Sequence, residues 1–407
     1  MTERTDILIV GGGLVGASLA LALDAAGRAA TLLEAQPVRV PAIASGAAGD
    51  DNDRNLVLAR ASVNALRALA VWPLLDAAAG TIRRVEVSRA GEFGRVRLAA
   101  ADAGVDTLGR VVPGRVLGAA LEQRLAACRQ VRRVDSARLV ALSTTEAGWR
   151  ARIATAAGER DIDARLVVGA DGSDSLVRAQ VGIAAQEHDY AQGLFVCTVA
   201  CERDIPDCAF ERFSDEGPVA LLPLPNGRRG LVLTVAAERH DAVATMDDAA
   251  FVALAQQRFG WKLGKLSRPG RRFPHRIRRV LADAITAPRA VLVGNAAQTL
   301  HPIGAQGFNL GLRDALTLAE LIADVDDPGA STLLGEYAVR RAPDRDGVLA
   351  FSHGLSALAC LAQPSLAPLR SLAMLALDRV PPLRHAVARR GMGFRGAPPA
   401  ATLDRGP

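Results

Sequence analysis

The first 34 residues constrain the fold of this chain more than any other stretch. Residues 7–10 form a short apolar run, typical of a buried parallel strand. Three glycines in G-x-G-x-x-G spacing follow at once, namely Gly11, Gly13 and Gly16. In that spacing one glycine permits a tight turn, one leaves bare backbone for a pyrophosphate, and one lets a helix pack closely on the strand.

The residues after these glycines complete the pattern. Residues 14–26 predict a helix whose N-terminus faces the pyrophosphate, and residues 30–33 predict a second strand. Glu34 ends that strand, where its carboxylate can accept hydrogen bonds from the adenosine ribose. An acid there also repels a ribose phosphate, so the segment predicts a site for FAD or NAD rather than NADP. The alternative is a tight strand–helix turn without a ligand.

Composition narrows the class of protein. A length of 407 residues exceeds one compact core of average size and predicts two closely connected domains. The net charge is +6, but no dense Lys/Arg block is interleaved with aromatic residues, so we expect no nucleic-acid partner. The cysteines lack zinc-ligand spacing with histidine, so we expect no metal site. Without a signal peptide or a long apolar run, we expect a cytoplasmic protein.

Two further glycine-containing segments lie downstream. Residues 166–168 predict a buried strand leading to Asp171 and Gly172, which either approach a cofactor or simply cap a short helix. Residues 290–293 predict another strand, followed by Asn295, a Pro- and Gly-rich loop, and a helix over about 309–323. The N-terminus of that helix would present free amides to the negative edge of a reduced flavin.

Other segments connect these three. Residues 36–53 predict a surface loop, and Ser62 is a candidate N-cap for a helix from residue 63. Arg54 and Arg115 are candidate phosphate ligands, although the residues alone favour a solvated loop arginine at Arg54. Four successive strands without helices between them predict an antiparallel sheet, with a hairpin turn at Asn226–Gly227; they span 194–201, 209–213, 219–223 and 230–236. Such a sheet beside a cofactor domain commonly forms one wall of a substrate pocket.

The three segments, in this order, resemble the FAD-dependent aromatic hydroxylases of the para-hydroxybenzoate hydroxylase type. GNAAQTLHP at 294–302 and QGFNLGLRD at 306–314 are similar to the ubiquinone-biosynthesis branch, whose substrates include 2-polyprenyl-6-methoxyphenol. The resemblance covers essentially the whole chain. It implies an α/β fold in which a Rossmann-like FAD-binding domain is interleaved with a mainly antiparallel substrate sheet and followed by C-terminal helices.

The resemblance divides the chain as follows. The FAD-binding domain takes residues 1–80, 105–182 and 279–345. The substrate domain takes residues 81–104 and 183–278. A C-terminal helical region at 346–396 precedes a disordered tail at 397–407.

The resemblance also implies roles for single residues. The first three glycines would hold the pyrophosphate and Glu34 the ribose, while Asp171, with Gly172, would lie near FAD and the nicotinamide donor. Asn295 stands where most of the superfamily has an aspartate that touches the ribityl chain. The isoalloxazine would lie against Pro302 and the loop that follows it, which supplies Gly304, Gln306, Gly307, Phe308 and Asn309. Ala305 takes a position that is normally glycine, which leaves the placement of the flavin open.

By this resemblance, NADPH or NADH reduces FAD, O₂ adds at flavin C4a, and the hydroperoxide hydroxylates a polyprenylated phenol. Pro302 and His301 are the catalytic candidates, although His301 could instead hold the loop in place. Alternatives are another ring position, a pigment or catabolic phenol, a related reductase or halogenase, and an FAD-stabilised scaffold of a biosynthetic complex. The leucine- and arginine-rich C-terminal region predicts either peripheral membrane or partner contact, or two packing helices.

Overall fold

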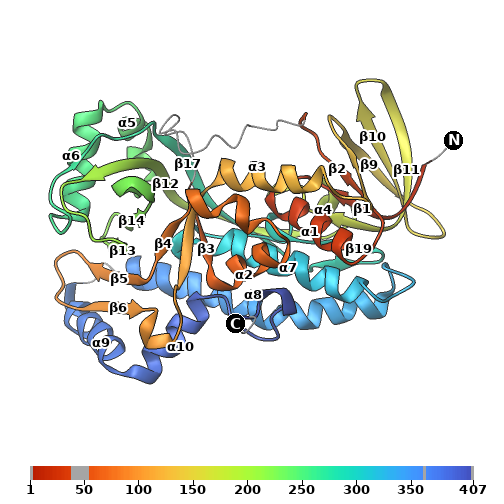
Figure 1. The fold of residues 1–407 in the computed structure, drawn as a ribbon. Helices are drawn as coiled ribbons and strands as arrows, with labels where there is room; N and C mark the ends of the chain where they lie inside the picture. Colours follow the sequence, from red (N-terminus) through yellow and green to blue (C-terminus); the bar gives the residue numbers. More distant parts are fainter. Residues whose placement is uncertain (1–2, 38–54, 361–363, 405–407) are drawn as a thin grey trace.

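The computed structural model describes residues 3–37, 55–360 and 364–404 (Figure 1). Its first layer is an eight-stranded sheet with the parallel order β19–β11–β1–β2–β8 at its centre. These strands are β1 (Glu3–Val10), β2 (Ala30–Leu33), β8 (Val131–Val134), β11 (Gly158–Gly169) and β19 (Ala290–Leu292). The apolar parts of these strands share one continuous core with three helices, namely α1 (Leu14–Ala25), α3 (Gly114–Leu125) and α7 (Gln306–Ile322).

Short strands and a small helix complete this layer. The hairpin of β9 (Arg138–Thr144) and β10 (Trp149–Thr155) pairs with the outer part of β11 in antiparallel register. The two-residue strand β18 (Thr286–Ala287) pairs with β19. The helix α4 (Leu176–Gln180) follows β11 and begins at Ser175, whose side chain caps it.

The second layer is a nine-stranded sheet in the order β20–β17–β12–β15–β14–β13–β5–β6, with β16 paired to β12. Its pairing is antiparallel except between β13 and β5, which confirms the predicted mainly antiparallel sheet. The strands are β5 (Arg84–Arg89), β6 (Arg95–Ala99), β12 (Ala185–Cys201), β13 (Cys208–Phe213), β14 (Val219–Pro223), β15 (Arg228–Ala236), β16 (Leu266–Ser267), β17 (Phe273–Ala282) and β20 (Gln298–Thr299).

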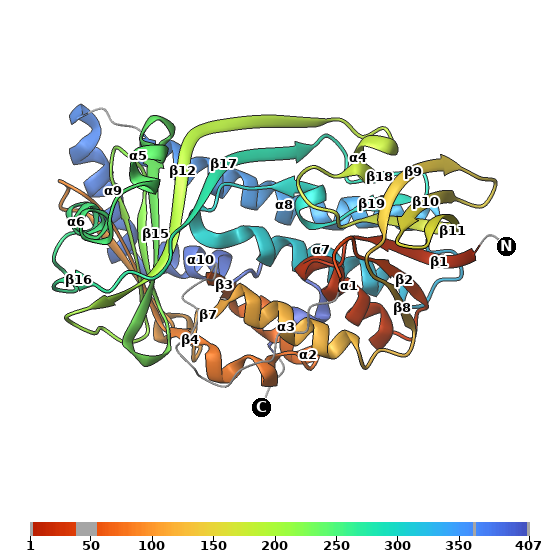
Figure 2. The ribbon, with the colours of Figure 1, turned by 90° about the horizontal axis from the view of Figure 1, so that it is seen from above.

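One face of this sheet is covered and the other is left for a pocket. Helix α6 (Asp248–Phe259) packs on the covered face through Phe251 and Phe259, close to the short helix α5 (His240–Ala244). The predicted turn at Asn226–Gly227 joins β14 to β15 with both residues at positive φ (60° and 69°). Figure 2 shows the paired strands β12 and β17 running side by side from this sheet toward the first layer.

A three-stranded sheet lies between the two layers. It consists of β3 (Asn55–Ala59), β7 (Gly109–Pro113) and β4 (Gly80–Ile82). Helix α2 (Arg60–Ala68) follows β3 directly and has Ala59 at its N-cap position. Ser62 therefore lies inside the first turn, fully buried, and the expected N-cap at Ser62 is wrong.

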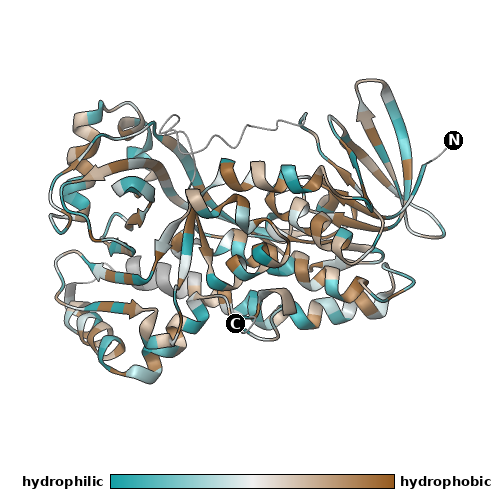
Figure 3. Ribbon diagram, in the orientation of Figure 1, coloured by the Kyte–Doolittle hydropathy of each residue, from teal (hydrophilic) through white to brown (hydrophobic). Residues whose placement is uncertain are grey.

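The C-terminal helices are α8 (Ser331–Cys360), α9 (Ala367–Arg379) and α10 (Pro381–Gly391). Helix α8 packs along α7, while α9 packs against β6. Hydrophobic residues recur along α9, as the brown bands of that helix in Figure 3 show. Within the described residues, no helix has the length and apolarity needed to cross a membrane.

The end of the chain departs from expectation. Residues 397–404, expected to be disordered, are packed against α2 through a short 3₁₀ turn at Ala400–Thr402. Asn64 donates a hydrogen bond to the carbonyl of Thr402, whose side chain is fully buried, and Arg60 is ion-paired with Asp404. The expected disorder is therefore wrong for these residues, because polar groups on α2 bind the tail.

Candidate active site

The turn between β1 and α1 has the geometry of a pyrophosphate cradle. Gly11 has φ +103°, and a Cβ there would lie 2.5 Å from the carbonyl oxygen of Ala170. A Cβ at Gly16 would lie 1.9 Å from the Gly11 oxygen, so both positions require glycine. At Gly13, in contrast, a Cβ would meet no described atom within 4 Å. Gly13 is the N-cap of α1 and has no side-chain cap, so free amides face open space that suits an anion.

Glu34 is fixed beside this cradle. Its Oε2 accepts a hydrogen bond from the Gly12 amide at 2.7 Å, and its Oε1 accepts one from the Gln36 amide at 2.8 Å. The carboxylate thus lies next to the α1 N-terminus, where a ribose would follow the pyrophosphate. Arg115 is exposed in the first turn of α3, one turn before Gly118, where an added Cβ would lie 3.9 Å from the Leu14 side chain.

Two predicted features lie partly or wholly outside the described residues. Most of the expected loop over 36–53, together with Arg54, lies outside the described residues. Ala305 lies outside the residues whose side chains the structure describes. The predicted roles of both residues therefore stay predictions.

Asp171 is engaged with its own chain. Its Oδ1 accepts from the Ser175 hydroxyl at 2.5 Å and its Oδ2 accepts from the Val177 amide at 3.1 Å, so the carboxylate caps α4. The backbone of Asp171 nonetheless borders the cradle, since a Cβ on Gly11 would lie 2.9 Å from its Cα. Gly172 has φ +88° and open space around it, as a close approach to a ligand requires.

The third glycine segment meets the first at one point. A Cβ at Gly311 of α7 would lie 2.8 Å from Val15 of α1 and 2.9 Å from the Cα of Gly294. Gly294 begins a 3₁₀ turn at Gly294–Ala296, in which Asn295 is exposed between two buried residues. The N-termini of α1 and α7 and the turn that carries Asn295 therefore border one site, although they are distant in sequence.

The residues at the start of α7 leave room for a flat ring. The helix begins at Gln306, three residues earlier than predicted. A Cβ at Gly307 would meet nothing within 4 Å, and Gly304 has φ +68°. Gln306 is buried, its Nε2 donates to the Gly304 carbonyl at 3.0 Å, and its Oε1 has no partner among the described residues. Open space beside glycine backbone and an unsatisfied buried acceptor fit the isoalloxazine of FAD.

Two residues predicted to bind the cofactor have other partners. Asn309 is buried, its Oδ1 accepts from the Ala59 amide at 2.9 Å, and its Nδ2 donates to the Val57 carbonyl at 2.8 Å. Its side chain therefore joins α7 to β3, and the predicted place of Asn309 in the loop along the flavin stays a prediction. Phe308 packs against the core of the first layer.

His301 is enclosed in the loop before α7. Its Nδ1 accepts a hydrogen bond from the Ile303 amide at 3.2 Å, which leaves Nε2 to donate to the Gln192 Oε1 at 3.1 Å. Tyr190 packs edge-on at 4.7 Å between ring centroids. Burial lowers the pKa of His301 to about 4, so the ring is neutral at pH 7. This geometry supports a role in positioning the loop that carries Pro302.

A cavity of about 470 Å³ lies against this loop. One wall is the open face of the second sheet, another consists of α9 and α10, and the loop from His301 to Gly304 closes one end. The lining is mainly apolar, with contributions from Val87, Leu98, Phe213, Leu222, Met374, Leu377, Val387 and Met392. Its charged groups are Arg89, Glu92 and Arg370, which bond to one another, and Glu211, which stands apart from them.

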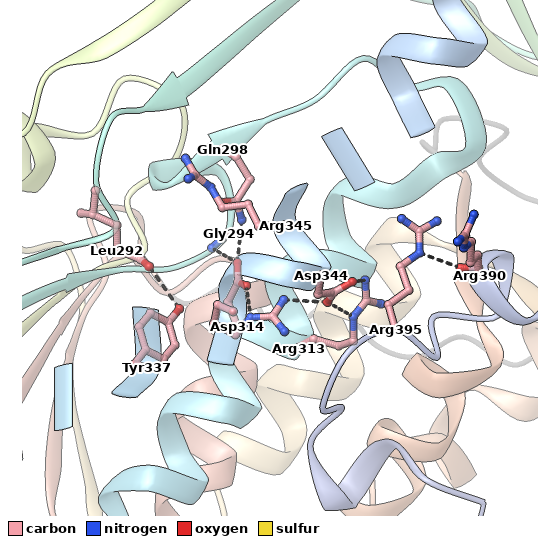
Figure 4. Close-up of polar contacts among 11 residues, drawn as sticks. Leu292, Gly294, Gln298, Arg313, Asp314, Tyr337, Asp344, Arg345, Arg390 and Arg395 are labelled. Carbon is pink, nitrogen blue, oxygen red and sulfur yellow. Dashed lines mark hydrogen bonds and ion pairs between the residues drawn. The ribbon is translucent and has the colours of Figure 1, made fainter. Parts of the chain in front are cut away.

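A buried ionic network lies behind the cofactor loop (Figure 4). Asp314 of α7 accepts from the Gly294 amide at 3.2 Å, from Gln298 at 2.6 Å and from Arg341 of α8 at 2.8 Å. Asp344 accepts from Arg341 at 2.8 Å and from Arg313 at 2.6 Å. Burial raises the pKa of Asp344, but the two arginines outweigh burial and hold it below its usual value. The network thus fixes the turn that carries Asn295.

Sequence reasoning missed Arg341, Asp344 and Glu211. Arg341 and Asp344 are three residues apart on one helix and look like an ordinary exposed pair, yet both side chains are about 1–2% exposed. Glu211 stands next to Arg212 in a short strand, and two adjacent charges resemble a solvated segment. All three could have been recognised as charged residues on a helix or strand face whose other residues are apolar and therefore expected to be buried.

The comparisons with known proteins agree with this geometry. The model of a family described as FAD binding domain matches residues 4–352, so the chain belongs to that family. The protein is an FAD-dependent monooxygenase of the aromatic hydroxylase superfamily, a class whose members typically use NAD(P)H as electron donor. The predicted family, fold class and cofactor are thereby confirmed.

Two curated relatives cover nearly the full length. The chain is 35% identical over 406 residues to ubiquinone hydroxylase UbiL of Rhodospirillum rubrum, covering 98% of this chain and 92% of the relative. It is 32% identical over 403 residues to 3-demethoxyubiquinol 3-hydroxylase of Escherichia coli, covering 96% and 99%. Among solved structures, p-nitrophenol 4-monooxygenase PnpA of Pseudomonas putida superposes with a TM-score of 0.75 at 17% identity, covering 95% and 97%, which shows the shared fold.

Proposed function

We propose that this monooxygenase hydroxylates a polyprenylated phenol in ubiquinone biosynthesis, with 2-polyprenyl-6-methoxyphenol as the substrate. The observation that carries the proposal is the apolar cavity of about 470 Å³ that ends at the loop after Pro302. A cavity of that size suits a substituted ring with the first part of an apolar chain. The names of the two full-length relatives support the pathway.

Different residues of the chain hold different parts of the cofactor. The backbone at Gly11, Gly13 and Gly16 holds the pyrophosphate, Glu34 the ribose, and Asn295 the ribityl chain. Arg54 and Arg115 approach the phosphates, and NADPH or NADH approaches near Asp171 and Gly172. When bound, FAD would pass electrons from NAD(P)H to O₂ and so provide the activated oxygen for the hydroxylation. Each of these roles can be tested by a single substitution.

The remaining residues orient the phenol and exclude water. Pro302 and Gly304 form the end of the cavity against which the phenol ring lies. His301 holds their loop in place through hydrogen bonds with Ile303 and Gln192. The apolar side chains of α9 and α10 cover the cavity and keep water from the reacting atoms. His301 serves here as a positioning residue rather than as a proton donor.

We further propose that α9 and α10 contact the membrane that holds the substrate. Leu369, Leu372 and Leu383 are 65%, 55% and 50% exposed, whereas Met374 and Leu377 of α9 line the cavity. The helix pair therefore separates the cavity from an exposed apolar surface. Arginines around that surface suit anionic lipid headgroups. A partner protein in a biosynthetic complex is the alternative occupant.

Vesicle binding tests this contact. The triple variant L369S/L372S/L383S should lose most of its cosedimentation with vesicles of phosphatidylethanolamine and phosphatidylglycerol. The control V339S changes a 75% exposed residue on α8 and should bind as the native protein does. Equal vesicle binding by the native protein and the triple variant would contradict the proposed membrane contact.

A direct assay tests the reaction. The FAD-loaded protein is incubated with NADPH or NADH, O₂ and a prenylated 2-methoxyphenol, and the product is analysed by mass spectrometry. The proposal predicts a product heavier by one oxygen atom. Hydroxylation of unprenylated catabolic phenols alone would redirect the substrate, and the absence of NAD(P)H oxidation with any phenol would favour the scaffold alternative.

A further inference from the structure

Glu211 lies in the middle of the apolar sheet face that forms the cavity wall. Because side chains alternate along a strand, Ala209, Glu211 and Phe213 of β13 share the cavity side. Across the sheet Glu211 is paired with Val87 of β5 and with Ala220 of β14. Both neighbours line the cavity, so the carboxyl is flanked by hydrocarbon on each side.

This carboxyl is close to the cofactor loop. Phe213, the next residue on the same face of β13, packs against Ile303 together with Val87. Ile303 follows Pro302 directly. Glu211 is therefore one side-chain position along the strand from the loop on which the flavin ring is proposed to lie.

Within the described part of the chain, the Glu211 carboxyl has no hydrogen-bond or ion-pair partner. The other cavity carboxyl, Glu92, is held by Arg89 at 3.1 Å and by Arg370 at 2.9 Å. A carboxyl withdrawn from bulk water is normally paired, because burying it alone costs free energy. Glu211 therefore has hydrogen-bonding capacity directed at whatever occupies the cavity.

We propose that Glu211 binds the hydroxyl group of the substrate phenol and takes up its proton, an inference that rests on the proposed phenol substrate. In this step the phenol O–H bond breaks and the proton passes to a carboxylate oxygen of Glu211. The electron pair stays on the phenol oxygen and raises electron density at the ortho and para ring carbons, where oxygen is inserted. The proton leaves to water when the product is released.

The protonation behaviour of Glu211 suits this role. Burial raises its pKa to about 7, so both forms are populated at neutral pH. The other titratable groups that line the cavity are Arg89, Glu92, Arg370 and His301. Arg89 and Arg370 are both bonded to Glu92, and both ring nitrogens of His301 are engaged by Gln192 and Ile303, so none of these groups supplies an alternative base.

Turnover of E211Q tests the proposal. We expect hydroxylation to fall at least about 100-fold in kcat with little change in KM, whereas NAD(P)H oxidation continues and releases hydrogen peroxide. The limb of the native kcat profile that rises near pH 7 should disappear, and E211D should restore part of the rate. The control is E86Q on β5, because Glu86 faces the opposite side of the sheet and is paired with Lys262.

Ligand ionisation gives a readout that does not need hydroxylation. Bound 4-nitrophenol should show an increased phenolate band at neutral pH in the native protein and E86Q, but not in E211Q. Equal bands in all three, or E211Q hydroxylating at the native rate, would overturn the role of Glu211 and leave the proposed function intact. Failure of the native protein to hydroxylate any phenol, with the E211Q difference in ionisation retained, would instead remove the proposed function.

Discussion

At the β1–α1 turn, Gly11, Gly13 and Gly16 share one sequence motif but occupy different environments. Gly11 and Gly16 press against backbone atoms of their own chain, while Gly13 faces open space. The motif therefore combines a folding requirement with a binding requirement. Substitutions to alanine should separate the two.

We predict that G13A weakens FAD binding at least about tenfold while the free energy of unfolding of the apo protein is unchanged, because its Cβ enters only the pyrophosphate space. G16A should destabilise the apo protein itself, since its Cβ would overlap the Gly11 carbonyl. Flavin titration and denaturant unfolding measure the two effects. Native FAD affinity in G13A would contradict the cradle assigned here.

His301 gives a prediction about pH. Its pKa is lowered to about 4 in the fold, against about 6.5 in the unfolded chain. The unfolded state therefore binds the proton first, so stability contributed by the neutral ring is present above pH 6.5 and is lost as the pH falls toward 4. H301Q should show a shallower loss of Tm over that interval than the native protein. Parallel curves for the two proteins would contradict the buried, neutral histidine.

The sequence could identify these residues but not the direction of their side chains. Asp171 and Asn309 stand in cofactor motifs, yet Asp171 caps α4 and Asn309 bonds to β3. A polar residue beside a glycine can serve either a ligand or the local backbone, and spacing does not distinguish these outcomes. Whether the side chain binds a ligand or the backbone depends on which element lies next to it in the fold.

At the scale of elements, the contact between α7 and α8 depends on the buried ionic network. We predict that D344N destabilises the protein by about 3–5 kcal/mol. The buried guanidinium groups of Arg313 and Arg341 would then lose the charged carboxylate that they share. FAD affinity should fall as well, since the network holds Gly294 through Asp314. The control D346N changes an exposed residue of the same helix. Equal denaturation midpoints for the two variants would show that the network adds no stability.

Element type was predictable where periodicity was strong. The parallel strands at 7–10 and 290–293 and the hairpin at Asn226–Gly227 follow from apolar runs and turn residues. Helix boundaries were less accurate: α7 begins at Gln306 and α2 at Arg60, before the predicted starts. In α2, whose N-cap Ala59 has no side-chain cap, the Arg60 and Ala61 amides donate instead to the carbonyls of Leu108 and Met392, which stabilises the early first turn.

At the scale of the whole molecule, the C-terminal helices are tied over the cavity by ion pairs. Asp378 of α9 accepts from the Arg97 amide at 2.8 Å and from its guanidinium at 2.7 Å. The hydrogen bond from Arg97 lowers the pKa of Asp378, so this pair stays charged at neutral pH. Arg384 of α10 lies 3.2 Å from Asp102. These contacts hold α9 against β6 and α10 against the 3₁₀ turn at Ala101–Ala103 that follows it.

We predict that D378A loosens α9 and admits water to the cavity. The share of NAD(P)H oxidation that ends in hydrogen peroxide rather than hydroxylated product should then rise several-fold. D161N is the control, because Asp161 is paired with Arg152 in the β10–β11 hairpin of the first layer. Unchanged coupling in D378A would mean that the helices do not serve as the cover of the cavity.

The assembly of these parts was the least predictable feature. The antiparallel sheet was expected, but the parallel pairing of β13 with β5 joins segments more than 100 residues apart and has no local signal. The packing of 397–404 on α2 depends in the same way on distant polar partners. Local sequence patterns specify strands and turns, whereas the neighbours of each strand depend on the chain as a whole.

Hydroxylation of a prenylated phenol by this monooxygenase can be tested in cells. Quinone intermediates are extracted from a strain that lacks this gene and has no redundant hydroxylase, and are measured by mass spectrometry. We predict accumulation of a prenylated methoxyphenol and loss of ubiquinone, both reversed by the native gene. An unchanged amount of ubiquinone in that strain would contradict the proposed substrate and would mean that the enzyme hydroxylates another phenol.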